Sequence, residues 1–107
     1  MATSKQYISF VLEQLSPFGA ASARQMFGEY MAYLDGKPIF TVCDNTVYAK
    51  RLPELADIMS AAPLGAPYPG AREGYIVDID DAELLSALIP LLYELTPEPR
   101  PRKKRQK

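Results

Sequence analysis

The chain contains no histidine and no tryptophan, and Cys43 is the only cysteine among its 107 residues. Without histidine it cannot build a Ser-His-Asp or Cys-His nucleophile pair, a histidine metal site or an imidazole proton shuttle. One cysteine excludes an internal disulfide and any multi-cysteine zinc or iron–sulfur site. Only carboxylates, lysines and tyrosines remain for acid–base chemistry, so we expect a protein that is not an enzyme and has no cofactor or metal.

Long apolar runs are also missing. No run approaches the ~18 residues that span a bilayer, and the first residues lack the charged-then-apolar layout of a signal peptide. A single cysteine is typical of a reducing compartment. We therefore expect a cytoplasmic protein of one domain, in which 48% hydrophobic residues can fill one core.

The net charge of −1 hides an uneven distribution. Residues 96–107 hold six basic residues and one acidic residue, whereas the preceding body holds six basic and twelve acidic residues. We predict a single domain over residues 1–95, followed by a proline-rich spacer and a basic, disordered tail over residues 96–107. The tail either solubilises the chain or binds nucleic-acid phosphates weakly and without sequence preference, falling off steeply with salt. The candidate phosphate contacts are Arg102, Lys103, Lys104, Arg105 and Lys107.

The N-terminal part of the chain has the apolar spacing of an amphipathic helix over residues 3–15. Thr3 is the expected N-cap, because Gln6 three residues later completes a capping box. Pro17 ends the helix, since proline disfavours helical geometry at the residue before it. Residues 20–26 are predicted to form a short helical turn.

The period then changes from 3.6 to 2, which predicts an antiparallel three-stranded meander over residues 29–34, 38–43 and 47–50. Asp35 and Gly36 supply the positive φ angles of a two-residue type I′ turn between the first two strands. That turn places Tyr33 opposite Pro38 and Met31 opposite Phe40, and strict alternation then divides the side chains between two faces.

Strict alternation also affects the second turn. It bonds residue 43 to the first strand of the meander, so the second turn must be a four-residue loop over residues 43–46. The core face is expected to hold Met31, Tyr33, Phe40, Val42, Val47 and Ala49. The mixed face is expected to hold Tyr30, Ala32, Ile39, Thr41, Cys43, Tyr48 and Lys50.

The second half of the chain reads as helix, loop, strand and helix. Pro53 opens a short helix, and residues 75–80 alternate as a strand. Asp80 or Asp81 caps a last, leucine-rich helix that kinks or restarts at Pro90. The whole order is helix, three strands, helix, one or two strands and helix, which is typical of an α+β domain with helices packed on an antiparallel sheet.

Several short motifs occur in a distinctive order: RQMFG at residues 24–28, Tyr30, Tyr33, LDGK at residues 34–37 and VYAK at residues 47–50. Together they resemble the TfoX/Sxy N-terminal domain family. The resemblance implies a fold like that of the type III secretion chaperones and a non-enzymatic role in the transcriptional control of DNA uptake. The motif residues that are candidates for binding a partner are Arg24, Met26, Phe27, Gly28, Tyr30, Tyr48 and Lys50.

Each candidate site also has a purely structural interpretation. Residues 24–28 form either a partner-binding corner anchored by Arg24 or a set of packing residues. The mixed face forms the seam of a homodimer or tight heterodimer, the floor of a ligand site, or a surface that a helix covers; its residues are Tyr30, Ile39, Tyr48 and Lys50. We interpret Cys43 as a buried hydrophobe rather than a nucleophile.

A carboxylate cluster near the last helix could ligate a hard cation such as magnesium, but capping and the helix dipole already explain most of it. Its members are Asp78, Asp80, Asp81 and Glu83. The sequence therefore predicts a non-enzymatic regulatory or protein-interaction module. The alternative is a nucleic-acid-associated accessory protein that binds phosphates through its tail.

Overall fold

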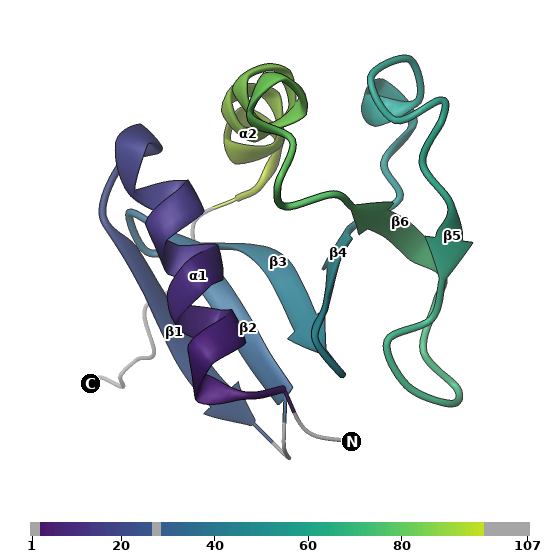
Figure 1. Cartoon of the computed structure of the whole chain (residues 1–107). Helices are drawn as coiled ribbons and strands as arrows, with labels where there is room; N and C mark the ends of the chain where they lie inside the picture. Colours follow the sequence, from purple (N-terminus) through teal and green to yellow (C-terminus); the bar gives the residue numbers. More distant parts are fainter. Residues whose placement is uncertain (1–2, 27–28, 98–107) are drawn as a thin grey trace, which may run out of the picture.

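A computed structural model of the chain describes residues 3–26 and 29–97. They form an α+β fold in which two helices pack on one antiparallel sheet of six strands, in the order β1-β2-β3-β4-β6-β5 (Figure 1). No helix in this part of the chain is long and apolar enough to cross a membrane. The elements are α1 (Lys5–Leu15), η1 (Ser16–Phe18), β1 (Ala21–Met26), β2 (Glu29–Leu34), β3 (Lys37–Cys43), β4 (Thr46–Ala49), η2 (Pro53–Leu55), β5 (Leu64–Gly65), β6 (Gly74–Val77) and α2 (Ala82–Leu95).

The predicted first helix is confirmed, but its cap lies one residue later. Ser4 is the N-cap, and its hydroxyl accepts a hydrogen bond from the Tyr7 backbone N–H at 3.1 Å. Thr3 is instead buried, where its Oγ1 accepts from the backbone N–H of Asn45 at 3.3 Å. The Ser4 N–H donates to Asn45 Oδ1 at 3.0 Å, so the start of α1 is tied to the turn between β3 and β4.

The predicted helical turn over residues 20–26 is wrong, because this segment is the edge strand β1 and pairs with β2 along its whole length. The β2–β3 turn holds its beginning in place. The Asp35 carboxylate accepts from the Ala20 N–H at 2.8 Å, and the Asp35 N–H donates to the Ala20 carbonyl at 2.8 Å. Pairing with a strong hairpin thus overrides the weak local preference of the segment.

The first hairpin turn is confirmed. Asp35 and Gly36 both have positive φ, as a type I′ turn requires, and Tyr33 pairs with Pro38. Beyond that pair the predicted register is wrong, because a β-bulge leaves Ile39 as an extra residue, so Ala32 pairs with Phe40 and Met31 with Thr41.

The bulge also corrects the two faces of the sheet. Two consecutive side chains, Ile39 and Phe40, are both buried. Ala32 therefore joins the core, whereas Met31 and Tyr33 lie on the opposite face and are only half-buried. The strand residues of the core are Ala32, Leu34, Ile39, Phe40, Val42, Val47, Ala49 and Val77.

The predicted four-residue loop between β3 and β4 is wrong for the same reason. Cys43 pairs with Thr46 across a two-residue turn, in which Asp44 and Asn45 both have positive φ. The extra residue in β3 reverses the direction of every later backbone N–H, so Cys43 bonds towards β4 instead of β2.

The predicted helix after Pro53 is only the short 3-10 turn η2, although Leu55 and Met59 are buried as expected. The predicted C-terminal helix is confirmed as α2, and Asp81 is its cap, accepting from the Leu84 N–H at 3.0 Å. α2 runs through Pro90 without a restart. Its buried leucines and isoleucine join those of α1 in one core, so both helices pack against the same face of the sheet.

Candidate functional site

The face of the sheet opposite the helices, here called the open face, carries a continuous row of side chains across five strands. Because paired residues point to the same side, the register places them next to one another. The row is Arg24, Met31, Thr41, Tyr48 and Ile76. Arg24 is exposed and the other four are half-buried, so this row combines a cation, a hydroxyl, an aromatic ring and aliphatic groups.

A cleft of about 690 Å³ lies at this row, where β3 and β4 diverge. β3 pairs with β4 only from Thr41 onwards, and Pro38 has no N–H to offer a neighbour. The chain departs from the sheet at Lys50, directly after β4, and this creates a gap. The gap is bordered by the loop before β6 and by the C-terminal end of α2. The apolar lining includes Met31, Pro38, Tyr48, Leu52, Pro67 and Leu95.

Three basic side chains border the cleft: Lys50, Arg51 and Arg72, all of them exposed. Arg51 Nη1 lies 3.8 Å from Glu73 Oε1, with both side chains more than half exposed, so this ion pair is weak and screened by water. Lys50 and Arg72 form no ion pair with any residue of the described ranges. The cleft therefore offers two unpaired cations beside an apolar floor.

The structure separates the residues that the sequence grouped as a seam. Tyr48 lies on the open face, whereas Tyr30 pairs with Val42 and packs against the core, and Ile39 is buried at 4% exposure. Tyr30 therefore lies on the opposite side of the sheet from Tyr48, whereas Ile39, although buried, lines the cleft together with Tyr48. A homodimer stays a prediction, and Tyr48 alone of the three remains available for it.

The other predicted site residues are placed as follows. Arg24 lies on the open face, and Lys50 lines the cleft. The strand pairing thus brings both residues to the same side of the sheet. Met26 is the last residue of β1. Phe27 and Gly28 fall outside the described residues, as do the tail cations Arg102, Lys103, Lys104, Arg105 and Lys107. Their predicted roles stay predictions.

Sequence reasoning missed Arg51, Arg72 and Glu73 as part of this site. They lie in loops, and only the pairing of β4 with β6 brings them together. Their exposed charge is an ordinary feature of loops, so no signal in the sequence marked them.

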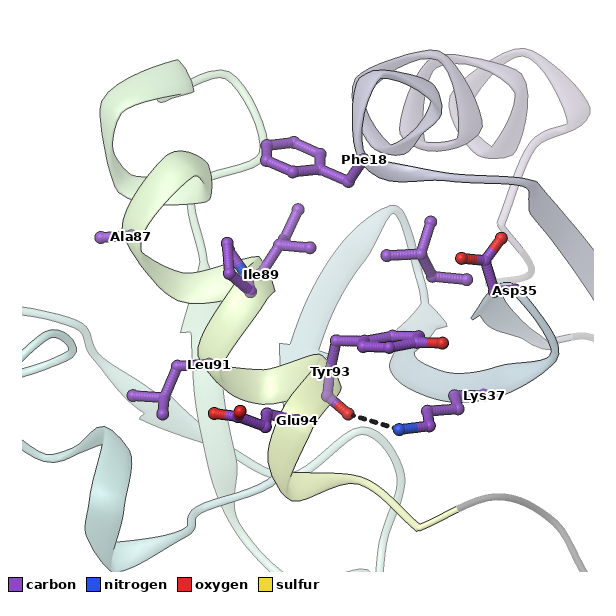
Figure 2. A pocket seen from close by; sticks show the side chains of 10 residues that line it. Phe18, Asp35, Lys37, Ala87, Ile89, Leu91, Tyr93 and Glu94 are labelled. Atoms are coloured by element: carbon purple, nitrogen blue, oxygen red, sulfur yellow. Dashed lines mark hydrogen bonds between the residues drawn. The ribbon is translucent and has the colours of Figure 1, made fainter.

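A second cavity, of about 700 Å³, lies between the β2–β3 turn and α2 (Figure 2). Two of its three charged groups, Asp35 and Lys37, already serve the fold. Lys37 Nζ donates to the Tyr93 carbonyl at 3.0 Å and lies 4.0 Å from the centroid of the Tyr93 ring, so it neutralises the C-terminal end of α2. The Asp35 carboxylate holds the Ala20 N–H, as described above. This cavity is therefore the weaker candidate for a site.

Comparison with known proteins places the chain in a family. The sequence profile of the TfoX N-terminal domain matches residues 13–86, which is well over half of the chain. The chain belongs to the TfoX N-terminal domain family. It is also 32% identical to an uncharacterized 12.7 kDa protein in the trpE 5′ region of Spirochaeta aurantia, over 100% of this chain and 95% of that protein. The TfoX N-terminal domain is of a regulatory type and is not known for catalysis.

The carboxylates near α2 have structural roles in this TfoX N-terminal domain. Asp81 caps α2, and Asp78 Oδ1 accepts from the Asp80 N–H at 3.1 Å. Residues 3–26 and 29–97 contain no group of three or more metal-ligating side chains that could hold an ion.

Two of these carboxylates also affect a tyrosine of α1. Burial raises the pKa of Tyr7, and the charges of Asp80 and Asp78 raise it further.

Cys43 is half-buried on the open face of the TfoX N-terminal domain. Burial raises the pKa of this thiol, and the nearby carboxylates of Glu29 and Asp44 raise it further. A raised pKa leaves less thiolate, which is the form that reacts with alkylating reagents.

We expect iodoacetamide to alkylate Cys43 severalfold more slowly than free cysteine near neutral pH, with the rate rising only above the usual titration range of a thiol. Mass spectrometry at a series of pH values measures this rate. Glu29→Gln removes one of the charges and should shift the profile to lower pH, whereas Glu13→Gln on α1 should not. A Cys43 rate equal to that of free cysteine would contradict this assignment.

Proposed function

We propose that this chain is a non-enzymatic regulatory module that acts by binding another macromolecule through the open face of its sheet. The observation that carries this proposal is the placement of both helices on one face of the sheet. That placement leaves the row from Arg24 to Ile76 on the face away from the helices, and only the C-terminal end of α2 borders its cleft. A sheet face with a half-buried tyrosine, aliphatic groups and a rim of charge is typical of interaction surfaces.

The regulated process that best agrees with the family is transcriptional control, including that of genes for DNA uptake. The family is of a regulatory type. Such a module acts on transcription by binding a macromolecular partner, which the open face would contact.

A host strain that lacks the gene tests this proposal. We expect the deletion to change the abundance of a defined set of transcripts, and the wild-type chain to restore it. Tyr48→Glu should fail to restore it, because the new carboxylate would lose its hydration when the partner covers the open face, and that loss costs free energy. Gln6→Glu adds the same charge on the exposed side of α1 and should restore it fully.

A folding defect in Tyr48→Glu is separated from a binding defect by Arg24→Glu, which changes an exposed side chain of the same face. We expect both variants to fail in restoration at wild-type protein levels, as measured by RNA sequencing and immunoblotting. Unchanged transcripts in the deletion strain, or full restoration by both variants, would refute the proposal.

The second candidate function, phosphate binding, is favoured by one specific observation. Pro97, the last described residue, lines the same cleft that Lys50, Arg51 and Arg72 border. The last described residue therefore lies at the place where the folded body also gathers its cations.

A further inference from the structure

Positive charge is concentrated at the open face and its cleft, in a body that is otherwise acidic. Residues 3–97 contain six basic and twelve acidic residues. Four of the six basic residues lie on the open face or line the cleft, together with two acidic residues, whereas the other ten acidic residues lie elsewhere. The four basic residues are Arg24, Lys50, Arg51 and Arg72, and the two acidic ones are Glu29 and Glu73.

This arrangement selects a negatively charged occupant. A basic segment of the same chain is excluded by charge, since it would meet Lys50 and Arg72, which have no ion-pair partner among the described residues. Instead Lys50 and Arg72 attract an anion, and an anion that carries several charges can contact both of them at once.

The floor of the cleft indicates which polyanion fits. Tyr48, Met31 and Leu52 line it together with the cations, so the cleft combines an aromatic ring, aliphatic groups and positive charge. Single-stranded nucleic acids bind to this combination, because their phosphates pair with cations while their unpaired bases stack on aromatic rings. A duplex keeps its bases stacked inside, and the carboxylate side chains of an acidic peptide do not stack on an aromatic ring.

We propose that the cleft and the open face bind a single-stranded nucleic acid, with phosphates against Lys50 and Arg72 and a base stacked on Tyr48. Arg51 contributes less, because Glu73 partly neutralises it. This inference rests on the proposed use of the open face, but it names a ligand that can be tested with the purified protein alone.

Fluorescence anisotropy with a labelled oligothymidylate of about a dozen nucleotides tests the site. We expect Lys50→Glu and Arg72→Glu each to weaken binding about tenfold at low salt, because each reverses a phosphate contact. Lys5→Glu makes the same charge change on the exposed start of α1 and should alter the affinity less than about twofold. A loss with Lys5→Glu equal to that with Lys50→Glu would overturn the site, since it would show attraction by net charge alone.

Stacking is tested separately from charge. Tyr48→Leu should weaken binding about fivefold or more, and Tyr48→Phe should keep it, because phenylalanine retains the ring. Removal of residues 98–107 should weaken binding but leave the effects of Lys50→Glu and Tyr48→Leu in place. The shortened chain should also keep a logarithmic salt slope of about 0.7 per remaining phosphate contact.

Three further results would overturn the proposal. The first is that Lys50→Glu and Tyr48→Leu have no effect while removal of residues 98–107 abolishes binding. That result would assign the binding to residues 98–107 alone. Oligoglutamate of equal charge displaces the label as well as unlabelled oligothymidylate does, which indicates an acidic peptide instead. The purified protein binds no oligothymidylate while Tyr48→Glu still fails to restore transcripts, in which case this inference fails and the proposed function stands.

Discussion

Phe40→Ala should lower the free energy of unfolding by about 3–5 kcal/mol, the largest effect that we expect of any single substitution in this chain. The Phe40 side chain is 1% exposed and is one of the largest that the core buries completely. Phe40 lies opposite Ala32, and the small side chain of Ala32 cannot fill the space that the phenylalanine ring would leave. The cost therefore combines lost apolar burial with a cavity.

The matched control for Phe40→Ala is Met31→Ala in the neighbouring strand. Strict alternation without a bulge would place Met31 in the core with Phe40, whereas the structure places it half-buried on the open face. We expect Met31→Ala to cost about 1 kcal/mol or less, since little of its burial is lost. Urea denaturation followed by circular dichroism measures both values. Equal losses for the two variants would contradict the assigned faces.

Gly74→Ala should also destabilise the fold strongly, by about 1–3 kcal/mol, because the added methyl group has no room. A Cβ at Gly74 would lie 2.6 Å from the carbonyl oxygen of Ala49 in β4. That neighbour is backbone, so β6 must move away from β4 to relieve the contact. The movement would also widen the cleft, which Ala49 and Gly74 both line.

Gly65→Ala is the matched control for Gly74→Ala, because Gly65 pairs with Gly74 in the adjacent strand. A Cβ at Gly65 would lie 3.0 Å from Ile76 Cδ1, the end of a flexible side chain that can turn aside. We therefore expect a cost of about 0.5 kcal/mol or less for Gly65→Ala, measured by thermal unfolding alongside Gly74→Ala. A smaller loss for Gly74→Ala than for Gly65→Ala would contradict the pairing of β4 with β6.

The elements with strong local signals were predictable from the sequence. Asp35 and Gly36 form the expected turn, Asp81 caps α2, and apolar spacing identified α1. β1 was not predictable in the same way, because residues 21–26 have neither alternation nor helical spacing. Only their pairing with β2 makes them a strand.

The β-bulge at Ile39 explains most of the remaining errors, and one signal could have revealed it. Asp44 and Asn45 suit a tight two-residue turn as well as Asp35 and Gly36 do. Two such turns around one central strand require an extra residue in that strand, because strict alternation cannot serve both. The adjacent apolar residues Ile39 and Phe40 indicated the position of this extra residue, because two consecutive apolar side chains break the alternation of a strand.

The candidate site was predictable only in part. The family motifs include Arg24, Tyr48 and Lys50, which the structure brings to the open face and its cleft. Arg51 and Arg72 are 21 positions apart in the sequence and border the same cleft only because β6 pairs with β4. Long-range pairing of this kind leaves no local pattern, so the cleft needed the structure.

The central claim is that the open face, rather than the helical side, is the surface that binds. An NMR titration of the ¹⁵N-labelled full chain with unlabelled oligothymidylate tests it most directly. We expect the amide signals of Met31, Thr41, Tyr48 and Arg72 to shift with one common affinity, while those of α1 stay unchanged. Shifts confined to α1 and the exposed side of α2, or to residues after Pro97, would contradict the claim.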